Sequence, residues 1–554
     1  MAKNLLPPTG FIKYFSTKQA SIICLLIAIL CKAALLFSFY SIQGSLLMGD
    51  MLSQALAAKN LVEGHGLMLT HVHADDLSKL VYDPLPEWPP AYSLVVSVFY
   101  MLLNNNLDAA CFAVSVCSFA AFLLLLYRLL LFLQLPVYLI NILILLNGLS
   151  ITDYVQRFSP TDASAMFFCM WSCYLTAVFI IKKERSPYFG FFHGFINACA
   201  GLFRYMYVGF FPVLPLLLIC NGWYKKDKRI LRGGLYSLAI SILLTVGMLV
   251  FQYLYTGSAL YAKPSEKGFF FENLLHIHPF AISSLINLNF YIIQLQLHTG
   301  ILYDSWMKIA TAGGVVSLLI LLYVFTRYGL KKALTGKTAR EIFFAAGGIV
   351  SCFILVILCT ISVRNSSYFN EIPESRWTFV SENRYFAVAG IVVQLFLACC
   401  LFGYTTNGRR GKTMWVLRFM FLLICSIEIL HGGYFILKFY KGQGPVPQIG
   451  ETKILNRVLK ENREKRIYTV FTSTGNIFFD KAAYLGAGVL KKPDALNGPG
   501  IKSSKPVFML ICLRFDTIKY FSYFLRRYGV NYIGNENGYL FFTYYIKPVA
   551  NSYK

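Results

Sequence analysis

The sequence predicts a polytopic α-helical membrane protein that carries a small extracytoplasmic α/β domain at its C-terminal end. Two bulk properties support this class: of the 554 residues, 57% are hydrophobic and only 14% are charged. That balance excludes a soluble globular protein. The third observation is the distribution of charge. Lys and Arg gather in short clusters between long apolar runs, and charged residues become frequent again after residue 438.

The apolar runs predict the membrane spans. A span needs about 20 apolar residues, within a range of roughly 17 to 25, and on this rule we expect about eleven transmembrane helices. Their expected ranges are 19–42, 107–133, 135–151, 161–181, 187–203, 205–220, 234–254, 306–326, 342–362, 385–405 and 414–437.

The basic clusters predict the orientation, because cytoplasmic loops are enriched in Lys and Arg. All the clusters lie inside only if two apolar stretches, 89–103 and 279–297, do not cross. Both are short or interrupted by Asn and Gln, so we expect interfacial or re-entrant helices on the outer face. The clusters in question are Lys13 with Lys18, Arg128, 182–185, 225–229, 331–340 and 409–412.

This topology places the N-terminus in the cytoplasm and the C-terminus outside, since the number of spans is odd. The cytoplasmic loops are then short and basic and carry no Gly-rich nucleotide-binding pattern. Function is therefore expected on the outer side. The segments expected there are 44–106, 152–160, the region around 203–204, 255–305, 363–384 and everything after about 438.

The C-terminal part changes character after the last span. Residues 442–447 read as a linker, and the sequence then predicts strands over 465–471, 530–533 and 540–543 and a helix over 521–528. We therefore divide the chain into a transmembrane domain, 1–440, with a large first outer loop, 44–106, and an extracytoplasmic α/β domain, 441–554. About 100 residues are enough for a domain to bury a core of its own.

Net charge and cysteine usage exclude other classes of partner and site. The formal net charge of +25 comes largely from clusters that the topology explains, and no basic-aromatic module indicates a nucleic-acid partner. Most cysteines lie inside apolar runs, where buried thiols are the expected state. Only Cys512 follows the last span, which excludes a disulfide framework in the C-terminal domain.

The first outer loop holds the leading catalytic candidate. Asp50 follows Gly49 at the mouth of the first span. It would make a good N-cap for a helix that starts at Met51 and that Gly64 would end. A catalytic role is compatible with this, because an N-cap carboxylate is already held in place. His71 and His73 near Asp75 and Asp76 are a weaker signal, typical of a solvated loop.

The next outer turn places Asp153 and Asp162 on either side of a short polar segment. Asp162 heads an apolar span, so N-capping is one interpretation. The other is a ligand for a cation or for a metal-bound phosphate, because an acid at a membrane boundary commonly faces a polar cavity.

Arg204 stands between two apolar runs and falls on the outer side. It is a candidate for holding an anionic headgroup, and snorkelling to water is the alternative. Glu382, Arg384 and Tyr385 directly precede a late span on the same side, and a Glu/Arg pair beside an aromatic residue suits a phosphate or sugar contact. Structural pairing at the interface competes with this reading. His276 and His278 have metal spacing but no identifiable third ligand.

Taken in order, these features resemble the GT-C superfamily of integral-membrane glycosyltransferases, and in particular the bacterial branch akin to protein O-mannosyltransferases and lipid A aminoarabinose transferases. The resemblance covers about residues 1–437 in the order of its elements, and the small C-terminal domain has counterparts in relatives. The motifs that carry it are Gly49-Asp50, the residues of 57–66, Trp88-Pro89-Pro90-Ala91-Tyr92-Ser93, Asp162, Arg204 and Glu382-Asn383-Arg384-Tyr385.

The resemblance implies transfer of a sugar from a polyprenyl-phosphate donor to a lipid, glycan or protein acceptor on the outer face of a bacterial inner membrane. Asp50 would be the catalytic base. Arg204 and Arg384 would hold the lipid phosphate, with Glu382 and Tyr385 beside the donor. Asp162 would be the second-loop acid, which is a metal ligand in some relatives, so a divalent metal is the one candidate cofactor.

The sequence departs from the motifs of the family at two places, and two other functions stay open. A single acid follows Gly49 where an acidic pair would indicate a eukaryotic-like protein mannosyltransferase, and Pro89-Pro90-Ala91 lacks the Gly that often follows the prolines. A flippase for lipid-linked sugars is the first rival, although no paired interrupted spans indicate inverted repeats. A non-catalytic envelope-assembly subunit is the second.

Overall fold

The structure is a computed structural model of the whole chain. It describes most of the helical part, namely residues 17–43, 50–72, 79–85, 88–149, 160–181, 188–257, 303–330, 337–363, 383–403 and 412–441. In the C-terminal part it describes 467–471, 488–490, 507–514, 530–536 and 539–546, and it also covers the single positions 186, 457 and 526.

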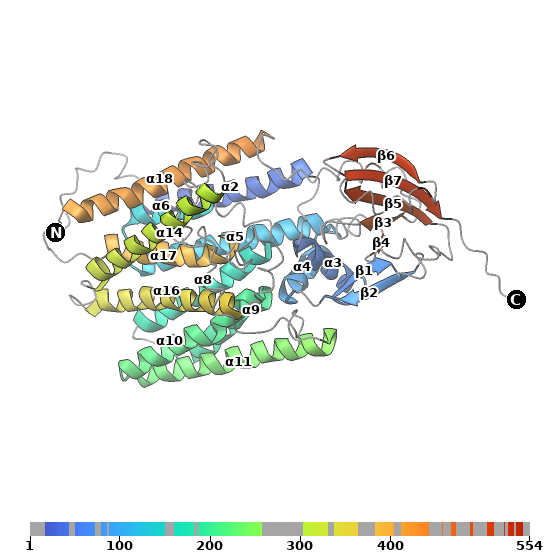
Figure 1. The fold of residues 1–554 in the computed structure, drawn as a ribbon. Coiled ribbons are helices and arrows are strands. Elements are labelled where there is room, and N and C mark those ends of the chain that lie inside the picture. The colour runs from blue at the N-terminus through green and yellow to red at the C-terminus, as the bar shows by residue number, and fades with distance from the viewer. Residues whose placement is uncertain are drawn as a thin grey trace. The chain divides into compact units, whose positions relative to one another are not determined.

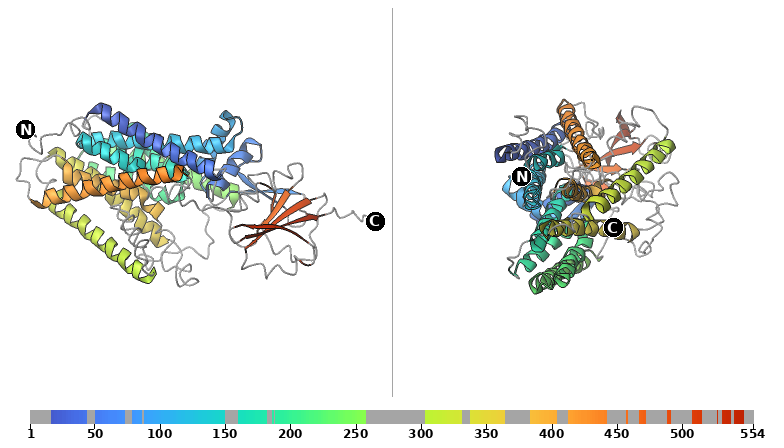
Figure 2. Two further views of the ribbon diagram at one scale, coloured as in Figure 1. Left: turned by 90° about the horizontal axis from the view of Figure 1, so that it is seen from above. Right: turned by 90° about the vertical axis from the view of Figure 1, so that its left-hand side faces the viewer.

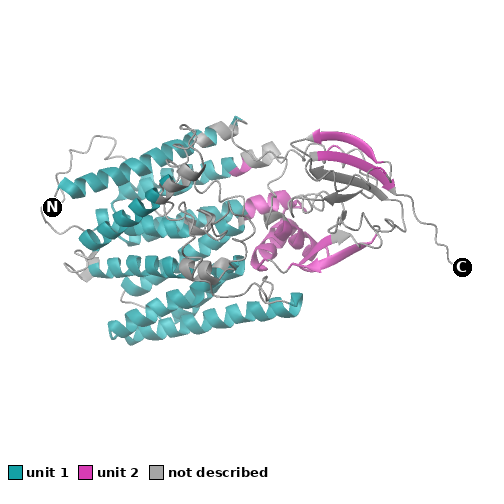
Figure 3. Cartoon of the chain, viewed as in Figure 1, with its two compact units in different colours: residues 1–35, 115–444 teal, residues 36–114, 445–554 magenta. Residues whose placement is uncertain are grey.

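The chain forms two compact units (Figure 3). Unit 1 comprises residues 1–35 and 115–444, and unit 2 comprises 36–114 and 445–554. Residues 44–106 therefore belong to the same unit as the C-terminal segment. The boundaries between the units fall within two helices, α2 (Lys18–Gln43) and α5 (Leu107–Phe132).

Unit 1 is helical, and its long helices run broadly alongside one another (Figures 1 and 2). A helix occupies each of the eleven ranges in which the apolar runs predict a span. These are α2 (Lys18–Gln43), α5 (Leu107–Phe132), α6 (Val137–Leu149), α8 (Pro160–Ile181), α9 (Tyr188–Phe203), α10 (Phe210–Tyr224), α11 (Lys228–Thr256), α14 (Tyr303–Val324), α16 (Lys337–Val363), α17 (Asn383–Phe402) and α18 (Lys412–Tyr440). The short η1 (Tyr205–Gly209) joins α9 to α10, and η4 (Phe325–Leu330) extends α14.

Among the described residues, 7 helices are long and apolar enough to cross a membrane. They lie in α2, α5, α8, α10 with the end of η1, α11, α14 with most of η4, and α18. The ranges 135–151, 187–203 and 385–405 coincide instead with shorter apolar helices. At about 1.5 Å per residue, the 13 residues of α6 cover roughly 20 Å of a hydrocarbon core that is about 30 Å thick. The count of eleven spans thus stays a prediction.

One part of unit 1 depends on close contacts between three helices, α8, α9 and α11. The Cβ that Gly190 of α9 lacks would meet the carbonyl oxygen of Gly233 in α11, and the Cβ that Gly233 lacks would lie 2.6 Å from the Phe179 ring of α8. Small residues allow such backbone approach, which supplies much of the packing between helices in lipid. The backbones of α8, α9 and α11 therefore lie close together in this α8–α9–α11 layer. The turn that carries Arg204 follows directly after α9.

Unit 2 begins with a helical pair and a hairpin. The pair is α3 (Asp50–Val62) and α4 (Ala91–Leu102), and the hairpin is β1 (Met68–Val72) with β2 (Leu80–Pro84), which run antiparallel. Helix α4 lies inside the stretch 89–103 that we expect to be interfacial, and Pro90 precedes its first turn. The other expected interfacial stretch, 279–297, lies outside the described residues.

A five-stranded sheet forms the C-terminal part of unit 2, with the strand order β4-β3-β5-β7-β6. Strand β3 (Ile467–Phe471) pairs in parallel with β4 (Gly488–Leu490) and with β5 (Val507–Arg514). Strand β7 (Tyr539–Ile546) runs antiparallel to both β5 and β6 (Asn531–Glu536). The strands expected over 465–471, 530–533 and 540–543 correspond to β3, β6 and β7. The expected helix over 521–528 falls almost entirely outside the described residues.

Candidate functional site

The structure brings two of the predicted site residues together at one end of α8 and α9. The Nε atom of Arg204 lies 2.5 Å from Oδ1 of Asp162, and Nη1 of Arg204 donates a hydrogen bond to Oγ1 of Thr161 at 3.3 Å. The arginine is 3% exposed, Asp162 is 7% exposed and Thr161 is fully buried. This cluster of Thr161, Asp162 and Arg204 is the candidate site of unit 1.

Local sequence explains how each member is presented. Helix α8 begins at Pro160, and proline suits the first turn of a helix, where an N–H would have no partner in the helix. Asp162 then lies in the first turn, where a carboxylate interacts favourably with the helix dipole. Arg204 follows the last residue of α9 and is extended, with φ −154° and ψ 123°. Its backbone N–H donates to Ala200 O, and its own carbonyl accepts from Tyr207 N–H.

Burial decides between the alternatives that the sequence leaves open. Arg204 does not snorkel, because its guanidinium is enclosed and ion-paired. The N-cap interpretation of Asp162 is wrong, because α8 begins two positions before it. Enclosing two charges costs several kcal/mol per ion in desolvation, and the mutual attraction offsets this only when the geometry is good. A buried charge pair in a membrane protein is thus a functional-site hypothesis by default.

A second buried cluster fixes α9, the helix that leads to Arg204. His193 is fully buried, and its Nε2 lies 2.8 Å from Oγ1 of Thr176 in α8, while its Nδ1 lies 2.7 Å from Oγ of Ser237 in α11. The Thr176 hydroxyl donates its hydrogen to Ser172 O. Nε2 of His193 is therefore the donor to Thr176, and Nδ1 accepts from Ser237. One imidazole thus links three helices.

The structure describes Asp50 through the backbone of α3. Asp50 is the first residue of α3, although its side chain lies outside what the structure describes. Four positions later, the carbonyl of Gln54 accepts a hydrogen bond of 2.8 Å from the hydroxyl of Ser93 in α4. Both side chains are buried. The Trp-Pro-Pro-Ala-Tyr-Ser motif therefore has a structural role, because its serine ties α4 to the helix that Asp50 begins.

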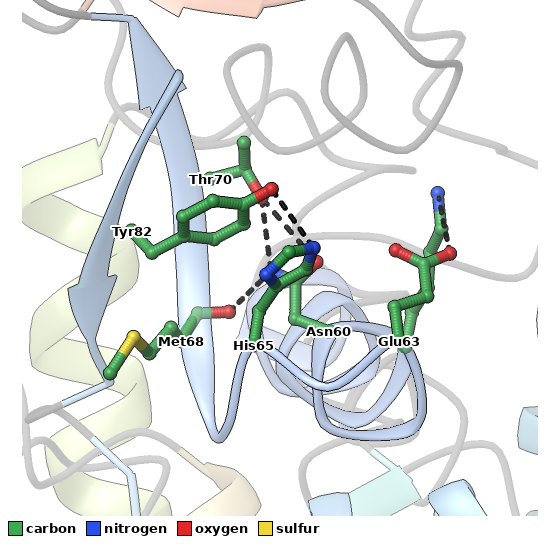
Figure 4. Close-up of polar contacts among 7 residues, drawn as sticks. Asn60, Glu63, His65, Met68, Thr70 and Tyr82 are labelled. Carbon is green, nitrogen blue, oxygen red and sulfur yellow. Dashed lines mark hydrogen bonds and ion pairs between the residues drawn. The ribbon is translucent and has the colours of Figure 1, made fainter.

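The end of α3 is tied to the hairpin (Figure 4). Nδ2 of Asn60 donates to Met68 O at 2.6 Å and to Oγ1 of Thr70 at 3.0 Å. The ring of His65 stacks on Tyr82 with centroids 4.1 Å apart, and the Tyr82 hydroxyl lies 3.1 Å from Nε2 of His65. The loop expected after the helix depends on Gly64, which has a positive φ of 86°.

The other predicted residues are only partly described. Arg384 and Tyr385 lie in the first turn of α17, and nothing of their side chains is described. His71 lies in β1, where its side chain is likewise not described. The remaining candidates, Glu382, Asp153, His73, Asp75, Asp76, His276 and His278, lie outside the described residues. Roles for these positions stay predictions.

Several buried polar residues were not predicted from the sequence. Thr161 and His193 are polar groups inside apolar helices, where periodicity does not distinguish them, and Ser93 was noted only as the last residue of the Trp-Pro-Pro-Ala-Tyr-Ser motif. Glu428 carried a clearer signal, because an acid within an apolar run is rare. It is fully buried in α18, and its carboxylate has no hydrogen-bond partner among the residues that the structure describes.

The described residues do not assemble a metal site around Asp162. One of its oxygens is engaged by Arg204, and no group of three or more His, Cys, Asp or Glu side chains comes together in the described part of the chain. A Mg²⁺ or Ca²⁺ ion needs at least six oxygen ligands. A metal at Asp162 stays a prediction, and no step below depends on one.

The sequence matches no family model and no curated protein. Its fold, however, is similar to that of ArnT from Cupriavidus metallidurans in the apo state, with a TM-score of 0.52 over 95% of this chain and 98% of that one, at 10% identity. ArnT bound to undecaprenyl phosphate gives 0.48 over the same shares, also at 10% identity. The apo oligosaccharyltransferase of Archaeoglobus fulgidus gives 0.49 over 94% of this chain and 74% of that one, at 11% identity. The likeness to ArnT shows that the two chains share a fold.

Proposed function

We propose that this protein is a glycosyltransferase that moves a sugar from a polyprenyl-phosphate donor to an acceptor at the outer face of the membrane. The observation that carries the proposal is the buried pair of Arg204 and Asp162 on a GT-C-type fold. A bundle that served only to span the membrane would gain little from enclosing an ion pair at a helix end.

The phosphate of the lipid-linked donor is the proposed ligand of Arg204. The polyprenyl tail stays in the bilayer, and the phosphate needs a cation that presents several N–H groups in a planar array. ArnT has been solved bound to undecaprenyl phosphate, a compound of the proposed class. Arg204 is proposed to hold the donor phosphate, with Asp162 and Thr161 orienting the guanidinium. Arg384, Glu382 and Tyr385 are proposed as further donor contacts.

The acceptor reacts at the anomeric carbon of the donor sugar. Asp50 is proposed to take the proton from an acceptor hydroxyl or amine as general base. The new bond forms between the acceptor atom and the anomeric carbon. The bond from that carbon to the phosphate oxygen breaks, and polyprenyl phosphate leaves with both bonding electrons. Stabilising the charge that develops on this phosphate is the work assigned to Arg204 and Arg384.

The proposal includes the topology expected from the basic clusters. The protein would be a multi-pass component of a bacterial inner membrane with about eleven spans, a cytoplasmic N-terminus and an outer face formed by 44–106 and the domain 441–554. The transferred group would be a hexosyl or pentosyl unit, and the acceptor a lipid, a glycan or a protein of the envelope.

The decisive experiment compares envelope glycolipids and glycoproteins by mass spectrometry in cells with and without the protein. A product that disappears with the protein should return with the wild type and fail to return with Asp50→Asn. The matched control is Asp83→Asn, which removes a charge from β2 of the same outer loop. Normal product with Asp50→Asn, at equal expression, overturns the role of Asp50.

The same preparations separate the rival functions. If purified protein in liposomes moves lipid-linked sugar across the bilayer without forming a transfer product, it is a flippase. If Asp50, Asp162 and Arg204 each tolerate replacement by alanine while deletion of 445–554 abolishes the product, the chain acts as an assembly subunit.

A further inference from the structure

The chain reverses direction immediately after Arg204. Helix α9 ends at Phe203, Arg204 is extended, and η1 then leads into α10 at Phe210. Arg204 is therefore the link between α9 and η1. Because these two elements pack against each other, the backbone of Arg204 is held on both sides, and this holds the direction in which its side chain leaves the turn.

Pro215 removes one backbone hydrogen-bond donor from the first turns of α10. In an α-helix the carbonyl of residue i accepts from the N–H of residue i+4. The partner for Phe211 O would be position 215, which is proline and has no N–H. In a membrane an unsatisfied backbone carbonyl costs several kcal/mol, so another donor is needed.

Asn197 of α9 supplies that donor. Its Nδ2 lies 3.1 Å from Phe211 O and 3.1 Å from Phe210 O, and the side chain is 1% exposed. The same nitrogen lies 3.4 Å from Oγ of Ser241 in α11, whose hydroxyl donates to Gly194 O at 3.0 Å. The amide is thus held between α9, α10 and α11.

A second contact lies one turn further along the same face of α9. A Cβ at Gly201 would be 3.1 Å from Cγ2 and 3.2 Å from Cα of Val208 in η1. Residues four apart share a helix face. Asn197 and Gly201 therefore join one face of α9 to the segment that follows Arg204, Asn197 through α10 and Gly201 through η1.

From these contacts we infer that Asn197 is a positioning residue: its bond to the carbonyl that Pro215 leaves without a donor fixes the reversal that aims Arg204 at Asp162 and Thr161. The consequence for donor binding rests on the proposed function. The role of Asn197 in holding the turn does not rest on it, and that role predicts that a second substitution rescues the first. Pro215→Ala restores an N–H at position 215, so it should rescue Asn197→Ala.

The geometry is tested by cross-linking. Gly201→Cys with Val208→Cys puts one thiol on each of the two segments that meet here, where a Cβ at position 201 would lie 3.2 Å from Cα of residue 208. The rate at which the two thiols form a disulfide with copper phenanthroline, followed by peptide mass spectrometry, reports how closely η1 lies on α9. Asn197→Ala should slow the reaction about tenfold, the value of one buried hydrogen bond. Asn197→Ala with Pro215→Ala should return the rate to that of Pro215→Ala alone.

Binding is tested with undecaprenyl phosphate on the purified full chain. Asn197→Ala should raise its Kd about tenfold, and adding Pro215→Ala should restore it to within about twofold. The matched control is Asn221→Ala in α10, since the Asn221 Oδ1 is buried and has no hydrogen-bond partner in the described part of the protein. It should leave both the cross-linking rate and the Kd unchanged.

The two proposals fail differently. If Asn197→Ala cross-links at the wild-type rate, or if Pro215→Ala does not rescue it, the positioning role is overturned even when donor binding is normal. If the wild type does not bind undecaprenyl phosphate while the cross-linking pattern is as expected, the donor site is wrong and the positioning role of Asn197 stands.

Discussion

Arg204 and Asp162 form an ion pair, 2.5 Å from Nε to Oδ1, although 42 positions separate them in the chain (204 − 162). Each lies at one end of a different helix, and both are enclosed. Such a pair has two separable roles. It can hold α8 and α9 together, or it can keep a guanidinium ready for a phosphate.

Replacing one partner or both distinguishes these roles. Arg204→Met leaves Asp162 as a buried charge without its counter-ion, which should cost about 3–5 kcal/mol. Arg204→Met combined with Asp162→Leu removes both charges, and the cost should largely disappear. We expect the thermal unfolding midpoint in detergent to fall for the single variant and to recover for the double variant. Transfer activity should be absent from both. A double variant that transfers sugar would show that the pair is structural only.

Ser93 and Ser97 offer a matched pair of substitutions in α4. Both side chains are buried, but Ser93 donates across to Gln54 O of α3, whereas Ser97 donates to Leu94 O of its own helix. Ser93→Ala should therefore loosen α3 by about 1 kcal/mol. Hydrogen–deuterium exchange of residues 50–62 should speed up in Ser93→Ala and stay unchanged in Ser97→Ala. Equal exchange in both variants would remove α4 as the support of the helix that Asp50 begins.

Arg204 and Asp162 were each predicted as candidate site residues from the sequence, but their pairing was not. A cation between two apolar runs and an acid at the head of a span are visible as local exceptions to hydropathy. Their meeting depends on how α8 packs against α9, and that packing is set by His193, Thr176 and the glycines, none of which stands out in a hydrophobic sequence.

The ends of the helices could not be predicted from the sequence either. Among the residues that the structure describes, the apolar runs located every long helix of unit 1, but an apolar run does not show where a helix begins and ends. The expected span 135–151 includes Pro136, and α6 starts only at Val137. Proline disfavours helical conformation in the residue before it, so the helix is shorter than the run.

Glycines of α9 and α11 should differ sharply in their tolerance of alanine. A Cβ at Gly194 would lie 3.0 Å from the backbone Cα of Ser237, whereas a Cβ at Gly247 would have no atom within 4 Å. Gly194→Ala must push α9 away from α11 and should lower the unfolding midpoint. Gly247→Ala should be neutral or stabilising by up to about 1 kcal/mol, because alanine favours helix. The two midpoints, measured side by side, would refute this contact if they moved together.

His193 should be the most sensitive single position of the α8–α9–α11 layer. His193→Ala removes the partner of both Thr176 and Ser237 and leaves a cavity among three helices. Each hydrogen bond lost between membrane helices costs about 0.6–2 kcal/mol, and the cavity adds to this. The unfolding midpoint should fall, and donor binding should weaken because α9 carries Arg204 at its end.

An apolar replacement of the whole cluster separates loss of the network from loss of histidine. In the triple variant His193→Phe, Thr176→Val and Ser237→Ala, no hydroxyl or imidazole remains to be satisfied, so much of the stability should return. The control for removing a histidine is His65→Ala, since His65 is exposed and stacks only on Tyr82 among the rings described. If His193→Ala were as well tolerated as His65→Ala, the imidazole would not be what holds α9 between its neighbours.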